Sequence, residues 1–127
     1  MRVKDLYRAV AVTVDAGQSL ASAARRMLAH DIGSLAVLED GQLAGIVTER
    51  DLARAVADDA DMAVTPVGYY VSLAPASAAP DEDAEAVAGR MLELGVRHLP
   101  VVDHGEVIGM LSVRDLLVLA AWQPAPS

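Results

Sequence analysis

Apolar positions follow two different periodicities along the chain, and the same succession occurs twice. In the first half, the β-branched run 10–14 indicates a strand, and apolar residues over 20–28 recur at helical spacing. The runs 35–38 and 43–47 flank Asp40-Gly41, a pair that favours the positive φ angles of a tight hairpin turn. A second helix is expected directly after this predicted hairpin.

The second half repeats the pattern without a gap. The segment Gly45-Ile46-Val47-Thr48-Glu49-Arg50-Asp51 aligns with Gly109-Met110-Leu111-Ser112-Val113-Arg114-Asp115, a shift of 64 residues (from 45 to 109). The elements predicted by this shift lie at 73–78, 83–94, 99–102, 107–111 and 113–122.

Two units of strand, helix, hairpin and helix therefore account for the whole chain, with boundaries at 1–64 and 65–127 and a connector from about residue 57. The fold class is α/β, or α+β by some schemes. A unit of about 60 residues buries only about 60% of its unfolded surface and is marginally stable alone, so we expect the two units to pack together. The apolar stretch 116–122 fits either a subunit contact or the core between the repeats.

Composition narrows the function classes. Hydrophobic residues make up 54% of the 127 residues and charged residues 22%, which predicts a folded chain. The net charge of −8 disfavours nucleic acids and anionic membranes, and no apolar run approaches bilayer length. There is no cysteine, no cluster of histidines and no Walker-type, dinucleotide or zinc-protease motif. We expect a cytoplasmic protein without enzymatic activity, metal site or catalytic cofactor.

The repeated motif consists of a glycine, two apolar residues, a hydroxyl residue, two variable residues and an aspartate. One interpretation is structural, because Thr48 with Asp51, and Ser112 with Asp115, fit a reciprocal box that caps a helix N-terminus. The other turns the same groups outward, where the hydroxyl and the helix N–H groups attract phosphate and the carboxylate accepts both hydroxyls of a ribose. The pattern alone leaves both interpretations open.

In these motifs, in Leu99-Pro100-Val101-Val102-Asp103 and in its unit length, the chain resembles tandem cystathionine-β-synthase (CBS) domains, the arrangement called a Bateman module. The resemblance covers nearly the whole chain. It implies two β-α-β-β-α units related by pseudo-two-fold symmetry, with two clefts that in many members bind AMP, ADP, ATP or S-adenosylmethionine. It also implies pairing through helices into a disc-shaped homodimer.

Site residues follow from the resemblance position by position. Asp51 and Asp115 are expected to hold ribose hydroxyls, and Thr48 and Ser112 to contact phosphate or ribose.

Residues next to the second strand of each predicted unit distinguish the two repeats. Family members often carry basic residues before the Leu-Pro pair to meet phosphates, and here Arg97 and His98 stand there. The first repeat has Gly33-Ser34-Leu35-Ala36 instead, so we expect one competent site and a second that is weaker or empty. Ile32 and Val96 fit either an apolar wall for adenine or core packing.

The resemblance thus predicts a regulatory module that senses an adenosine compound between its two units and acts on a protein client that the sequence does not identify. The alternative is a structural or protein-interaction module in which the hydroxyl and the aspartate serve only as helix caps. A hydroxyl-x-x-aspartate pattern is compatible with either function.

Overall fold

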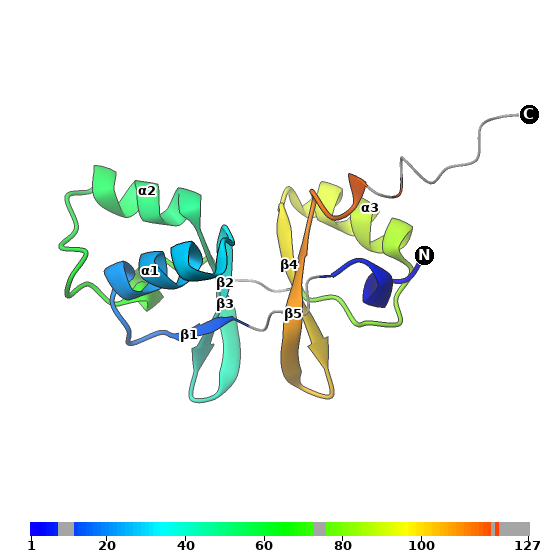
Figure 1. The fold of residues 1–127 in the computed structure, drawn as a ribbon, viewed down its shortest axis with the longest axis horizontal. Helices are drawn as coiled ribbons and strands as arrows, with labels where there is room; N and C mark the ends of the chain where they lie inside the picture. Colours follow the sequence, from blue (N-terminus) through cyan, green and yellow to red (C-terminus); the bar gives the residue numbers. More distant parts are fainter. Residues whose placement is uncertain (8–11, 73–75, 118, 120–127) are drawn as a thin grey trace, which may run out of the picture. The chain divides into compact units, whose positions relative to one another are not determined.

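The computed structural model describes residues 1–7, 12–72, 76–117 and 119, and the chain forms two compact units (Figure 1). The N-repeat unit comprises Ala11–Pro75, and the C-repeat unit comprises Met1–Val10 together with Ala76–Ser127. The elements of the N-repeat unit are β1 (Thr13–Asp15), α1 (Leu20–His30), β2 (Ser34–Glu39), β3 (Gln42–Thr48), α2 (Glu49–Ala57) and the 3-10 helix η2 (Val67–Tyr69). Those of the C-repeat unit are the 3-10 helix η1 (Val3–Asp5), α3 (Ala84–Leu94), β4 (His98–Asp103) and β5 (Glu106–Ser112).

Each unit is built around a hairpin that a tight turn closes. β2 pairs antiparallel with β3, and β1 adds to β2 in parallel. The turn residues Asp40 and Gly41 have φ angles of 52° and 77°, as the Asp-Gly pair predicts. β4 and β5 form the equivalent hairpin, with φ angles of 51° at His104 and 80° at Gly105. Both hairpins that the sequence predicts are therefore confirmed.

The helices α1 and α3 begin and end through the same local devices. Ser19 caps α1 by accepting from the backbone N of Ser22 at 3.1 Å, and Asp83 caps α3 by accepting from Ala86 N at 3.1 Å. Both helices end at a residue with positive φ, Asp31 in α1 and Gly95 in α3. These capping interactions confirm the helices predicted over 20–28 and 83–94.

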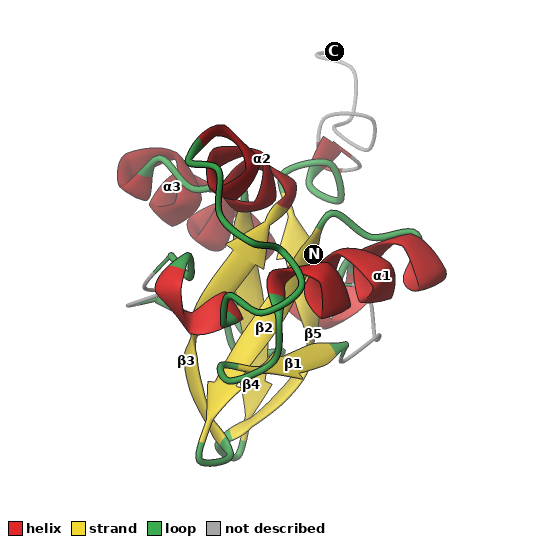
Figure 2. Cartoon of the chain, turned by 90° about the vertical axis from the view of Figure 1, so that its left-hand side faces the viewer, coloured by secondary structure: helices red, strands yellow, loops and turns green. Residues whose placement is uncertain are grey.

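One apolar stripe of each helix faces the core of its unit. In α1 the buried residues are Leu20, Ala23 and Met27, and they pack against strand residues that include Val37. Leu28, which shares the helical spacing, is 82% exposed because it follows Met27 directly and is therefore turned about 100° around the helix axis, out of the stripe. Figure 2 shows α1 and α2 covering one face of the sheet formed by β1, β2 and β3.

The segment that precedes each repeat docks on the unit formed by the other repeat. Val67 donates its N–H to the carbonyl of Gln18 at 2.7 Å, and Val3 donates to the carbonyl of Glu82 at 3.0 Å. Both valines are completely buried. The compact units therefore do not coincide with the halves 1–64 and 65–127, because η1 belongs to the C-repeat unit and η2 to the N-repeat unit.

Parts of three predicted elements lie outside the described residues: 10–11 of the first strand, 73–75 of the strand at 73–78, and 118 and 120–122 of the last helix. Within the described part, β1 is shorter than predicted, and Ala78 alone bridges to Val101 in the place equivalent to β1. Val113–Leu116 form turns rather than regular helix. No helix among the described residues has the length and apolarity needed to cross a membrane.

Candidate functional site

The first copy of the repeated motif lies where β3 passes into α2. The Oδ2 atom of Asp51 accepts from the backbone N of Thr48 at 2.8 Å and from its Oγ1 at 3.0 Å. In return, Oγ1 of Thr48 accepts from the backbone N of Asp51 at 3.3 Å. This is the reciprocal capping box, and it satisfies backbone donors that the first turn of α2 leaves unpaired.

The carboxylate of Asp51 is also covered. It is only 2% exposed, its Oδ1 lies 3.3 Å from the hydroxyl of Ser72, and Arg54 lies 3.6 Å from the same oxygen. Of the two interpretations that the sequence leaves open, the structural cap therefore describes the contacts of Asp51 in this structure. The physical reason is that the capping bonds, the Ser72 hydroxyl and the Arg54 guanidinium together compensate its burial.

The second copy of the motif has the same bonds but greater exposure. Oδ2 of Asp115 accepts from the N and the Oγ of Ser112, both at 2.9 Å, and Ser112 Oγ accepts from Asp115 N at 3.2 Å. Asp115 is half-buried. The two aspartates are thus equivalent in their caps and different in their access to solvent.

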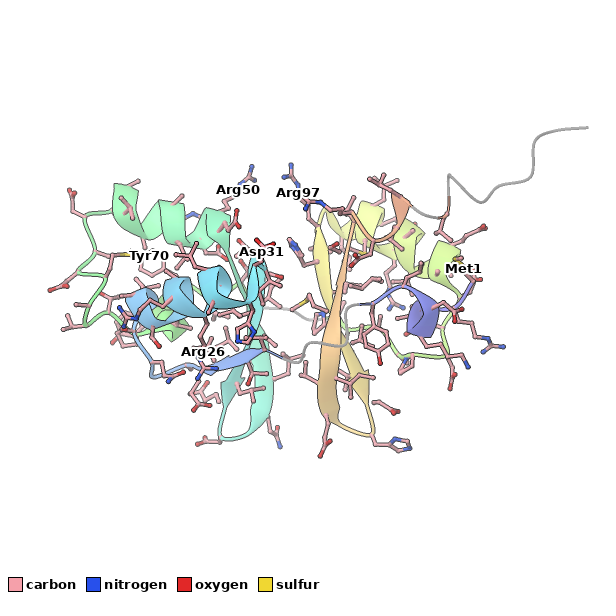
Figure 3. All side chains as sticks on the ribbon, viewed as in Figure 1. Met1, Arg26, Asp31, Arg50, Tyr70 and Arg97 are labelled. Carbon is pink, nitrogen blue, oxygen red and sulfur yellow. The ribbon has the colours of Figure 1, made fainter. Side chains whose placement is uncertain are left out.

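Strand pairing brings the predicted phosphate-contacting residues beside this second motif. His98 and Ser112 are direct partners in the β4–β5 register, and the backbone N of Val113 donates to the carbonyl of Arg97 at 2.9 Å. Arg97 is exposed and extends from the beginning of β4, at the end of the hairpin opposite to its turn (Figure 3). We call this group, Arg97, His98, Ser112 and Asp115, the C-repeat corner.

The corresponding N-repeat corner, formed by Gly33, Ser34, Thr48, Glu49 and Asp51, has the same backbone and different chemistry. Ser34 pairs with Thr48, and Glu49 N donates to the carbonyl of Gly33 at 3.1 Å. Ser34 is buried. No basic residue occupies the strand start, as the sequence indicates.

Ile32 and Val96 are half-buried and pack against the cores of their own units. Their backbone N–H groups donate to Met27 and Met91 in the same way, at 3.0 and 3.1 Å. Core packing, one of the two interpretations that the sequence leaves open, thus describes their contacts within each unit.

Two groups outside both corners have shifted pKa values. Hydrogen bonding to the Arg90 guanidinium lowers the pKa of Glu82, whose carboxylate lies 2.9 Å from Arg90. Partial burial, and then a hydrogen bond to the carboxylate of Asp58, raise the pKa of Tyr70. Among the described residues, no group of three or more His, Asp or Glu side chains is placed to hold a metal ion.

Two partners of Asp51 are absent from the sequence prediction. Arg54 stands three residues after Asp51 on α2, a spacing at which side chains meet on a helix, so this contact had a sequence signal. Ser72 comes from the segment after η2, and its backbone exchanges two hydrogen bonds with Ile46 at 2.8 and 3.0 Å. No motif marks Ser72.

A family model and a curated relative both match most of the chain. The family model "CBS domain" matches the chain twice, over residues 3–58 and 67–121. The chain is 32% identical over 116 residues to the CBS domain-containing protein YhcV of Bacillus subtilis, an alignment that covers 91% of this chain and 83% of the relative. It spans between 21% and 60% of several other curated relatives.

Two similar solved structures contain adenosine compounds. The CBS domain pair of protein MJ0100, in complex with 5′-methylthioadenosine and S-adenosyl-L-methionine, matches with a TM-score of 0.85 and 27% identity, over 95% of this chain and 96% of that one. The CBS domain protein PAE2072 from Pyrobaculum aerophilum, complexed with AMP, matches with a TM-score of 0.83 and 25% identity, over 95% and 99%.

Proposed function

The chain belongs to the CBS domain family, and from this premise we propose that it is a regulatory module that binds an adenosine compound and has no catalytic activity of its own. The compound is AMP, ADP, ATP or S-adenosylmethionine, and the module acts in the cytoplasm on a protein client. Two proteins of similar fold, whose structures were solved in complex with adenosine compounds, support the ligand class.

The observation that carries the proposal is the pairing of His98 with Ser112, which puts Arg97 beside the motif that contains Asp115. A guanidinium is suited to phosphate, and a carboxylate is suited to two neighbouring sugar hydroxyls. Because a carboxylate can accept about four hydrogen bonds, capping and ribose binding are compatible at Asp115. His98 and Ser112 add polar groups for the phosphate or the ribose.

Asp51 is the weaker ribose ligand in this proposal. A sugar would have to replace the Ser72 hydroxyl at a carboxylate that is almost completely covered. The cost of that exchange favours one competent site per chain, at the C-repeat corner, and a weaker one at the N-repeat corner.

The test is a thermal-shift titration with AMP, ATP and S-adenosylmethionine. A compound present at 100 times its dissociation constant stabilises the fold by about 2.7 kcal/mol. Asp115→Asn should abolish this gain. The matched control is Asp103→Asn, at the other end of the same hairpin, which should retain it. Absence of any shift with all three compounds would contradict the proposal.

A second candidate function is docking through helices, including formation of a homodimer. Leu28 of α1 and Leu92 of α3 occupy equivalent positions and are 82% and 84% exposed, so each repeat offers a large apolar side chain at the same helix position for such a contact. If they mediate a homodimer, Leu28→Asp with Leu92→Asp should yield a monomer in light scattering at concentrations where the unmodified chain is dimeric. A monomeric unmodified chain would contradict the homodimer.

A further inference from the structure

The two corners differ in charge at two backbone positions that are in contact. Residue 33 accepts a hydrogen bond from residue 49 in the N-repeat unit, and residue 97 accepts one from residue 113 in the C-repeat unit, at 3.1 and 2.9 Å. The N-repeat pair is Gly33 and Glu49, and the C-repeat pair is Arg97 and Val113. On the same local backbone, the N-repeat pair therefore carries an acid at its second position, and the C-repeat pair carries a base at its first.

The side chain of Glu49 lies over the glycine. A Cβ placed on Gly33 would be 3.0 Å from Oε1 of Glu49 and 3.3 Å from its Cδ. Because Gly33 has no side chain, the carboxylate of Glu49 has room to lie beside it.

The charges around Glu49 do not neutralise it. Arg54 lies at the carboxylate of Asp51, and Arg50 extends from the beginning of α2 into solvent (Figure 3). Within the described ranges, no cation lies within ion-pair distance of Glu49. In the part of the chain that the structure describes, Asp51 is thus buried and paired with Arg54, and Glu49 is the exposed carboxylate of the N-repeat corner.

We propose that Glu49 is a specificity-determining residue that disfavours phosphate at the N-repeat corner, so that this corner prefers adenosine or another nucleoside without phosphate to a nucleotide, while a nucleotide binds tightly at the C-repeat corner. The inference rests on the proposed function and deepens it, because it assigns a different ligand class to each repeat.

The expected size of the effect follows from Coulomb repulsion. A dianionic phosphate about 5 Å from an exposed carboxylate is repelled in water-like surroundings, and salt screens the repulsion over about 8 to 10 Å. Glu49 should therefore weaken the binding of a phosphate-bearing ligand by about five- to tenfold, and should leave adenosine almost unaffected.

The experiment compares AMP with adenosine by calorimetric titration of the intact chain. The variants are Glu49→Gln, which removes the charge and keeps the shape, and Glu106→Gln, a matched change at an exposed position by the hairpin turn of the C-repeat unit. We expect the unmodified chain to bind one AMP tightly. Glu49→Gln should strengthen a second, weak AMP site by about five- to tenfold, without changing adenosine affinity, and Glu106→Gln should change neither.

A second variant transfers the C-repeat pair into the N-repeat unit. Gly33→Arg with Glu49→Val removes the carboxylate that a side chain at residue 33 would meet, and it should give two AMP sites per chain. Asp115→Asn should abolish the tight site of the unmodified chain and retain the weak one.

Three results would overturn the assignment of Glu49: two equal AMP sites in the unmodified chain, an unchanged weak AMP site in Glu49→Gln, or an equal gain for adenosine and AMP. If neither AMP nor adenosine binds to any variant, the proposed function itself fails, and the inference fails with it. The two failures are therefore distinguishable in one set of titrations.

Discussion

Single residues of the repeated motif have unequal surroundings despite equal hydrogen bonds. Asp51 and Asp115 both close a capping box, but Asp51 is buried and also contacts Ser72 and Arg54. The sequence could not distinguish a cap from an outward carboxylate at either position, because a hydroxyl-x-x-acid pattern is compatible with both. The distinction depends on Ser72, which is 21 residues away from Asp51 in the chain.

This inequality predicts different costs of truncation. Asp51→Ala should destabilise the fold by about 2 kcal/mol, because it removes a buried carboxylate that accepts hydrogen bonds from Thr48 and Ser72. Asp115→Ala should cost less, about 1 kcal/mol, because Asp115 is half-exposed and its loss leaves less buried surface without a partner. Urea denaturation of the two variants beside the unmodified chain measures the difference, and equal losses would contradict it.

The ion pair between Glu82 and Arg90 predicts that the stability of the fold depends on pH. The pKa of Glu82 is below its ordinary value of 4.5 because Arg90 stabilises the charged carboxylate. The stability from this pair is therefore fully present above pH 4.5 and is lost as the pH falls through the lowered pKa. Because both side chains are more than one-third exposed, the contribution is only about 0.5 kcal/mol after solvent screening.

The variant Glu82→Gln tests the direction of this pH dependence. Its free energy of unfolding should lie below that of the unmodified chain at pH 6, and the two values should converge toward pH 3. Lys4→Gln, which removes an exposed 3.7 Å pair with Asp81, is the control and should leave the pH dependence almost unchanged. A gap that widens on acidification would contradict the prediction.

Whole elements were predictable where local chemistry decides them. The Asp40-Gly41 turn, the Ser19 and Asp83 caps and the terminal Gly95 each act within a few residues, and the elements they bound lie where the sequence predicts them. Leu28 shows the limit of periodicity, since its spacing fits the buried face of α1 and its side chain is exposed. Which apolar positions a helix buries depends on the sheet against which it packs.

Gly45 and Gly89 differ in how closely the neighbouring backbone approaches them. A Cβ on Gly45 of β3 would overlap the carbonyl oxygen of Ser72, so Gly45→Ala should destabilise the N-repeat unit by about 2 kcal/mol. Gly89, within α3, has open space around the same position. Gly89→Ala should therefore stabilise the chain by about 0.5 to 1 kcal/mol through helix propensity and a less flexible unfolded state.

Thermal denaturation of both variants gives the measurement. The melting temperature should fall for Gly45→Ala and rise for Gly89→Ala. A rise for Gly45→Ala would mean that the segment at Ser72 does not lie against β3 in solution.

At the scale of the whole molecule, each short 3-10 helix packs in the unit of the other repeat: η1 precedes the first repeat and belongs to the C-repeat unit, and η2 precedes the second repeat and belongs to the N-repeat unit. No feature of the sequence indicates this exchange. The two segments align with each other, Val3 with Val67, so the sequence pattern is equally compatible with docking of either segment on either unit. Periodicity and spacing are identical for both arrangements. The prediction of halves at 1–64 and 65–127 followed from the repeat in the sequence. The bounds of the compact units depend instead on the cores in which Val3 and Val67 are buried.

The exchange predicts that a substitution near one end of the chain loosens a distant segment. Val3→Ala should cost about 1 to 3 kcal/mol as a truncation of a fully buried side chain. Its effect on hydrogen exchange should be concentrated at α3, where the Ala84 N–H bonds to the Met1 carbonyl and Val3 bonds to Glu82. Val67→Ala should cost a similar amount and act at α1, through the contacts of Val67 with Gln18 and of Thr65 with Leu20. Each variant is the control for the other, and faster exchange in the helix of the same repeat would contradict the exchanged arrangement.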